Sequence, residues 1–117
     1  MIIALQVYYP DKMWREGLFA VVATGDSMYP EICDRDVVVC DKFDKLEDGD
    51  LVYYRLFNEV AIKIYNKDNN NTITFKPINN SPEFFPRTID IDDEAVYSQL
   101  EMARVVQVIR PIKRRRK

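Results

Sequence analysis

Ser27 and Lys63 are the two residues of this chain whose types and settings point to chemistry. Ser27 lies in the segment Gly25-Asp26-Ser27-Met28-Tyr29-Pro30, whose glycine and proline predict a tight bend. Lys63 follows 36 residues later, inside the apolar run Val60–Tyr65. A serine hydroxyl is a poor nucleophile at neutral pH unless an adjacent base removes its proton. The chain contains no histidine, so a Ser-His-Asp triad is excluded and lysine is the candidate base.

A lysine acts as a base only when its amine is neutral, and its ordinary pKa near 10.4 prevents this at pH 7. Burial disfavours the ammonium and lowers the pKa. Alternate residues of a strand share a face, so Lys63 is predicted to lie between Ala61 and Tyr65, neither of which is charged. A carboxylate beside Lys63 would hold the proton in place, and we expect none in the immediate strand. The sequence therefore indicates a setting that favours a neutral amine.

The bend at Ser27 has a complementary role. Gly25 permits backbone angles that other residues resist, and Pro30 limits how the chain leaves the bend. Such a bend exposes the Ser27 hydroxyl and aims nearby backbone N–H groups at a developing oxyanion. A simpler interpretation stays open for each residue: Ser27 caps a short turn, and Lys63 lays its stem across apolar surface with its amine in water.

The elements that would position these residues are strands. Turn signals separate short β-rich runs, and Asn58–Glu59 predicts a tight connection between two of them, which makes a hairpin. One or two helical turns are expected at residues 28–32 and 93–100. The fold class is therefore mainly β, with short, curved strands. The predicted strands are residues 18–24, 37–40, 51–57, 60–65, 72–76, 87–91 and 102–110.

Length and charge limit the organisation of the chain. Its 117 residues form one domain, which we assign to residues 1–112 with an N-terminal lead-in at 1–17. Residues 113–117 are all Lys or Arg, although the net charge of the whole chain is −2. This basic tail is expected to be a solvated chain end. The acidic remainder argues against a dedicated nucleic-acid surface.

The cysteine content and the hydropathy pattern exclude further classes. Cys33 and Cys40 form neither a disulfide framework nor a zinc site, since zinc takes about four ligands. Both are predicted to be small buried side chains in a reducing compartment. No apolar stretch approaches the roughly 18 residues of a membrane span, and the first seven residues do not resemble a signal peptide. We expect no metal, no cofactor, no membrane partner and a cytoplasmic location.

Four segments together resemble the LexA-like serine peptidase family, which comprises the C-terminal domains of LexA and lambda-type phage repressors and the mutagenesis protein UmuD. The similarity spans residues 18–110, and the block from the serine to the lysine is its most specific part. A later segment, Asn79-Asn80-Ser81-Pro82-Glu83-Phe84-Phe85-Pro86, resembles the family's Asn- and Pro-rich segment. The four segments are Gly25–Pro30, Asp34–Val39, Glu47–Val52 and Glu59–Lys63.

The resemblance implies a fold, an activity and a site. The fold would be the LexA/signal-peptidase-like one, of mostly antiparallel strands. Ser27 would be the nucleophile and Lys63 the general base of an autoproteolytic serine peptidase. The backbone at Ser27 would form part of the oxyanion hole, with Asp26 and Met28 beside the cleft.

The resemblance also implies partners. Family members cleave their own chain between this domain and an N-terminal DNA-binding domain when a RecA-type filament triggers them in the SOS response. Operator DNA would therefore be bound only through such an additional domain. Members also form homodimers, often through the last strand, where Val105, Val106, Val108 and Ile109 supply apolar area. Packing in the core is the alternative role for these four side chains.

Two departures from the family pattern affect these expectations. Only 26 residues precede Ser27, and the usual Ala-Gly cleavage dipeptide is absent. The scissile bond is therefore expected upstream of Met1 in a longer protein; otherwise the domain cleaves another protein or has lost its substrate. In addition, Arg35-Asp36 stands where the family often has Gly-Asp, which alters a turn rather than the chemistry.

Three other functions compete with the peptidase. A non-catalytic dimerisation and partner-binding module would keep the fold and lose the neutral lysine. A signal-peptidase relative shares the serine–lysine dyad but needs a membrane anchor. A nucleic-acid binder would use the basic tail and the seven tyrosines, but acidic residues surround those tyrosines and oppose binding.

Overall fold

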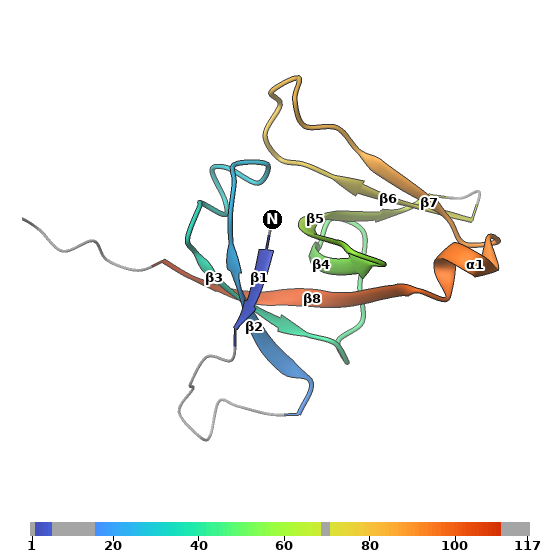
Figure 1. Ribbon diagram of the computed structural model, residues 1–117, viewed down its shortest axis with the longest axis horizontal. Helices are drawn as coiled ribbons and strands as arrows, with labels where there is room; N and C mark the ends of the chain where they lie inside the picture. The colour runs from blue at the N-terminus through green and yellow to red at the C-terminus, as the bar shows by residue number, and fades with distance from the viewer. Residues whose placement is uncertain (1, 6–15, 69–70, 111–117) are drawn as a thin grey trace, which may run out of the picture.

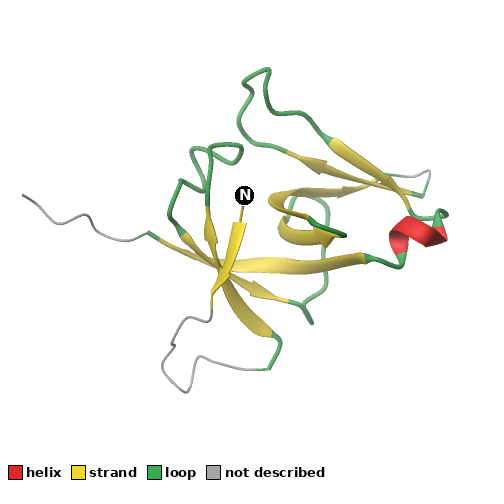
Figure 2. Ribbon diagram, in the orientation of Figure 1, coloured by secondary structure: helices red, strands yellow, loops and turns green. Residues whose placement is uncertain are grey.

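The computed structural model describes residues 2–5, 16–68 and 71–110, and its regular structure consists of strands and one short helix (Figures 1 and 2). The basic tail and most of the lead-in lie outside the described residues, so those two predictions remain predictions. The elements are β1 (Ile2–Leu5), β2 (Leu18–Ala23), β3 (Val37–Asp41), β4 (Leu51–Leu56), β5 (Glu59–Lys67), β6 (Thr72–Lys76), β7 (Arg87–Asp90), α1 (Glu94–Tyr97) and β8 (Leu100–Ile109).

The strands form one curled sheet in the order β1-β2-β3-β8-β4-β5-β6-β7. Every pairing between neighbouring strands is antiparallel. Strand β8 runs across the middle of the molecule (Figure 1), pairing residues 100–104 with β4 and residues 104–109 with β3. Between Val39 and Cys40 the register shifts so that Val106 is the extra residue of a β-bulge. The mainly β, antiparallel fold expected from the sequence is confirmed.

Alternating burial explains why these segments form strands. In β4, Val52, Tyr54 and Leu56 are buried while the residues between them are less so, as expected when one face of a sheet is covered. The Tyr54 ring stacks on Phe75 of β6 with centroids 4.0 Å apart. This contact joins β4 and β6, which are not neighbours in the sheet because β5 lies between them.

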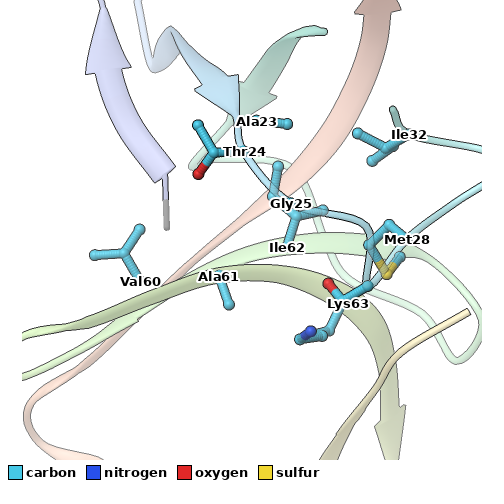
Figure 3. Close-up of a pocket in the computed structure, with 10 residues that line it drawn as sticks. Ala23, Thr24, Gly25, Met28, Ile32, Val60, Ala61, Ile62 and Lys63 are labelled. Atoms are coloured by element: carbon cyan, nitrogen blue, oxygen red, sulfur yellow. The ribbon is translucent and has the colours of Figure 1, made fainter. Parts of the chain in front are cut away.

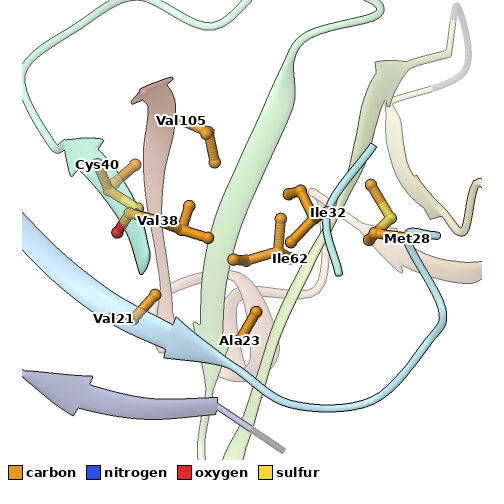
Figure 4. Packing of buried hydrophobic residues seen from close by; sticks show 9 residues of the cluster. Val21, Ala23, Met28, Ile32, Val38, Cys40, Ile62 and Val105 are labelled. Atoms are coloured by element: carbon orange, nitrogen blue, oxygen red, sulfur yellow. The ribbon is translucent and has the colours of Figure 1, made fainter. Parts of the chain in front are cut away.

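The core has two parts. One cluster lies between β2, β3, β5 and β8 and takes in Met28 and Ile32 from the segment after β2 (Figure 4). The other lies between β4, β5, β6 and β7. Strand β5 contributes Ile62 to the first cluster and Tyr65 to the second, so it is buried against both parts of the fold. The lysine is carried by this doubly packed strand.

Several local predictions need correction. Strand β1 was not predicted. The connection between β4 and β5 is Phe57–Asn58 rather than Asn58–Glu59, because Leu56 pairs with Glu59. By contrast, residues 28–32 form the single helical turn that was expected, closed by one bond from Ile32 N to Met28 O at 3.0 Å. Among the described residues, no helix has the length and apolar character needed to cross a membrane.

Candidate active site

The bend that carries Ser27 begins directly after β2. Gly25 has a φ of +95°, in the left-handed region that glycine adopts at least cost, and its N–H donates to Asp34 Oδ1 at 2.9 Å. Met28 and Ile32 bury their side chains in the core, at 3% and 2% exposure. Because buried residues follow it and a bonded glycine precedes it, Ser27 is held at the surface of the core, where it is half-buried.

A second segment holds the bend from the other side. The backbone N–H groups of Ile78 and Asn79 both donate to the carbonyl oxygen of Ser27, at 3.0 and 2.9 Å. The Asn79 side chain donates from Nδ2 to Asp26 O at 2.9 Å, and its Oδ1 accepts the Ser81 N–H at 2.9 Å. Sequence reasoning assigned Asn79 no role. Its Asn-Asn-Ser-Pro setting is a turn signal, but the partner 53 residues away was not predictable from it.

Ser27 and Lys63 line the same pocket, which has a volume of about 100 Å³. Figure 3 shows Lys63 on β5, below the bend that carries Gly25 and Met28. The structure thus brings together the two residues that the sequence singled out, although no direct hydrogen bond joins their side chains within the described residues. The rest of the lining is mostly apolar: Ala23, Thr24, Gly25, Met28, Ile32, Val60, Ala61 and Ile62.

Burial lowers the pKa of Lys63, and the negative charge of Glu59 raises it. Burial has the larger effect, so the pKa of Lys63 lies below its ordinary value. The expectation that β5 offers no carboxylate near Lys63 is therefore wrong. Glu59 is the first residue of β5, four positions before Lys63 and on the same face, because the hairpin turn ends one residue earlier than predicted. Part of its charge is compensated, since it accepts from the Tyr54 hydroxyl and pairs with Arg87 at 3.3 Å.

We expect Glu59→Gln to lower the pKa of Lys63 further, because the substitution removes the negative charge that favours the ammonium. At any pH below that pKa the fraction of neutral amine increases, and acetylation of Lys63 by acetic anhydride becomes several-fold faster. Mass spectrometry of Lys63 acetylation across a pH series measures this. Glu101→Gln, an exposed carboxylate on β8, is the control, and equal profiles for the two variants would contradict the assignment.

Of the two residues expected beside the cleft, Met28 and Asp26, only Met28 lies in the pocket. Asp26 is exposed and lines a separate hollow with Arg110, so its carboxylate does not lie among the residues around Ser27 and Lys63. Among the described residues, the N–H groups of Ser27 and Met28 have no hydrogen-bond acceptor, which leaves two backbone donors next to the nucleophile candidate.

The four apolar residues expected at a dimer interface also differ from one another. Val105 is a core residue with 9% exposure, whereas Val106 is 36% exposed at the bulge. Val108 packs against the core cluster, and Ile109 is half-buried. The packing alternative therefore holds for Val105, and Val106 is the side chain that faces outward.

The two cysteines and the possible metal ligands complete the description of the site. Both cysteines are free; Cys40 is buried, which raises the pKa of its thiol to about 12, while Cys33 is only half-buried, contrary to expectation. No group of three or more side chains suited to hold a metal ion occurs in residues 2–5, 16–68 and 71–110. The site consists of a hydroxyl, an amine and backbone N–H groups in an apolar pocket.

Comparison with known proteins gives one match to a protein family. The sequence model described as Peptidase S24-like matches residues 3–100, a span that contains the bend, the Lys63 strand and the loop of Asn79. No curated protein matches the sequence.

Proposed function

The chain belongs to the Peptidase S24-like family. From this premise we propose that it is the C-terminal peptidase and dimerisation domain of a phage-type or LexA-like transcriptional repressor, which cleaves its own chain with a Ser27–Lys63 dyad. One observation carries the proposal: a hydroxyl on a fixed bend and a partly buried amine from β5 line one small apolar pocket. The lowered pKa of Lys63 supports its role as the base.

In the proposed reaction, neutral Lys63 removes the proton of the Ser27 hydroxyl as Oγ attacks the carbonyl carbon of the scissile peptide bond. The carbonyl oxygen becomes an oxyanion, and the N–H groups of Ser27 and Met28 are the donors nearest to it. The Lys63 ammonium then gives its proton to the leaving amine, and the C–N bond breaks. Water hydrolyses the acyl-enzyme with Lys63 again as the base.

A small substrate side chain fits this pocket best. Its volume of about 100 Å³ corresponds to roughly three water molecules, and Ala23, Gly25 and Ala61 contribute little bulk to its lining. A decapeptide with a central Ala-Gly bond is therefore the probe of choice. Cleavage at that bond that rises with pH, together with a fluorophosphonate adduct on Ser27, is the expected result. A rate that stays flat from about pH 6 to pH 10, or the absence of both cleavage and adduct, would overturn the proposal.

We expect Asn79→Ala to slow cleavage by about 10- to 100-fold, because displacement of a reacting group by about 1 Å costs as much as 100-fold. The variant loses the bonds from Nδ2 to Asp26 O and from Ser81 N to Oδ1. Asn80→Ala is the matched control, since Asn80 is the exposed neighbour in the same loop. Cleavage of the decapeptide at saturating and limiting concentrations separates kcat from KM; an equal rate in both variants would show that Asn79 does not position Ser27.

Homodimer formation through β8 is a further part of the proposal, and Val106 is its most testable residue. A charged side chain at an apolar contact must lose water without gaining a partner, so Val106→Asp is expected to increase the dissociation constant about tenfold or more. Sedimentation velocity measures it. Phe57→Asp, at another exposed apolar residue with 57% exposure, is the control. Wild-type protein that remains monomeric at high micromolar concentration would remove this part of the proposal.

The wider biological role extends the same proposal. A RecA-type filament would trigger cleavage in the SOS response, an additional N-terminal domain would bind operator DNA, and the protein would act in the cytoplasm. These parts rest on family membership. Purified RecA filaments that fail to accelerate self-cleavage of the complete protein would remove the first of them.

A non-catalytic partner-binding module is the second candidate, and Glu59 is the observation that favours it. The charge of Glu59 stabilises the Lys63 ammonium, and an ammonium cannot accept the serine proton. The fluorophosphonate experiment separates the two candidates. In a non-catalytic module Lys63 keeps its proton and cannot activate Ser27, so no adduct forms on Ser27 at neutral pH.

A further inference from the structure

Thr24 has the one buried side-chain polar atom that lacks a hydrogen-bond partner in the part of the chain that the structure describes: its hydroxyl oxygen, Oγ1. The residue lies between the end of β2 and Gly25, and it lines the same pocket as Ser27 and Lys63. In Figure 3 its hydroxyl is on the side of the side chain that faces Val60 and Ala61 of β5. The unpaired group therefore belongs to the wall of the candidate active site.

An unpaired buried hydroxyl carries a desolvation cost that proteins normally avoid. Thr74, a buried threonine elsewhere in the sheet, shows the usual arrangement: its Oγ1 donates to Asp68 Oδ2 at 2.8 Å and lies 3.3 Å from the Thr88 hydroxyl. The same chain thus satisfies a buried hydroxyl on β6 and leaves one unsatisfied in the pocket. This contrast points to a partner that arrives with a ligand.

We infer that Thr24 Oγ1 hydrogen-bonds the main chain of the bound peptide substrate, donating to a carbonyl oxygen next to the scissile bond. This inference rests on the proposed peptidase function. A peptide that enters an apolar pocket loses water from its own amide groups and needs replacement partners. Ser27 and Lys63 are engaged in the reaction, and most of the remaining lining is apolar. Thr24 is therefore the side chain left to meet a substrate amide.

The energetics favour such a contact. Where it lies in the free protein, the Thr24 hydroxyl oxygen is buried without a partner, so a hydrogen bond to a peptide carbonyl relieves the cost of leaving it unpaired. Thr24 as a residue remains partly accessible, and a change between staggered χ1 rotamers moves the hydroxyl to the position held by the methyl group.

Thr24→Val tests the inference, because valine has nearly the same shape and lacks the hydroxyl. With the Ala-Gly decapeptide as probe, kcat/KM is expected to fall about tenfold or more, whereas Thr24→Ser keeps it within about threefold. The melting temperature of Thr24→Val is expected to equal or exceed that of the wild type, since an unpaired polar group leaves the interior. Labelling of Ser27 by a fluorophosphonate, which has no peptide main chain, is expected to proceed at the wild-type rate.

Thr74→Val is the matched control: it removes a hydroxyl that is bonded within the protein, so its melting temperature falls while kcat/KM changes little. Equal kcat/KM in Thr24→Val and wild type, or a loss of activity that only accompanies a lower melting temperature, would overturn the role of Thr24. If the wild type neither cleaves the decapeptide nor labels at Ser27, the proposed function itself fails and the role falls with it.

Discussion

Replacing Ser27 by alanine is expected to abolish cleavage while the fold remains intact. Removal of the nucleophile of a serine peptidase lowers kcat by about 10⁴- to 10⁶-fold, with the remainder due to binding and oxyanion stabilisation. The stability should change by no more than about 0.5 kcal/mol, because the Ser27 hydroxyl has no hydrogen-bond partner among the described residues. The bonds that hold the bend run through the backbone oxygen of Ser27, which alanine retains.

The measurement is decapeptide cleavage by Ser27→Ala beside Ser98→Ala, in which an exposed serine far from the pocket is changed. Circular dichroism and thermal unfolding establish that both variants fold. If Ser27→Ala cleaves at the wild-type rate, the nucleophile is another group. A loss of activity in both variants would indicate a general effect on the protein instead.

The strands were predictable because their signal is local. The predicted strands contain β-branched and aromatic residues between turn residues, and β2, β3, β4, β6 and β7 agree with their predicted ranges to within one residue. The errors in the predicted turns arise where the backbone adopts angles that the residue types do not indicate. Phe57 and Arg35 take positive φ values of 53° and 76°, a conformation that composition does not predict for them.

Arg35 also clarifies the departure from the family pattern. Its φ of 76° is one that glycine adopts without strain, and its N–H donates to Ala23 O at 2.7 Å. The bend is therefore the one a glycine would form, and arginine occupies it at some cost. This agrees with the view that the substitution alters a turn, because Arg35 does not line the pocket of Ser27 and Lys63.

The pairing of the two candidate residues was predictable in outline, whereas their surroundings were not. A serine on a bend and a lysine in an apolar strand are each common, and only the resemblance joined them across 36 residues. The contacts that hold the bend of Ser27 are long-range: the N–H groups of Ile78 and Asn79 donate to the Ser27 carbonyl oxygen, and the Asn79 side chain donates to the Asp26 carbonyl oxygen 53 residues away. No local pattern specifies such contacts.

Lys63→Met is expected to lower the cleavage rate and to raise the stability of the fold. Methionine has a similar length and cannot accept a proton, so cleavage should fall by about 10⁴-fold or more. Burial holds the pKa of Lys63 below its ordinary value of 10.5 in the folded protein. Between the folded and the ordinary pKa the unfolded chain therefore binds more protons, and stability increases with pH across that window. Below it, the half-buried ammonium lowers stability, and methionine removes this cost.

The melting temperature of Lys63→Met should therefore exceed that of the wild type near neutral pH, and the difference should diminish as the pH rises from the lowered pKa of folded Lys63 to its ordinary value of 10.5. Lys67→Met is the control, since Lys67 is exposed on the same strand. Lys63→Arg distinguishes a base from a charge: arginine stays protonated, so this variant is expected to be inactive without a gain in stability. A Lys63→Arg variant that cleaves the decapeptide would show that Lys63 is not the base. A Lys63→Met variant less stable than the wild type at neutral pH would show that burial of the Lys63 ammonium does not lower stability.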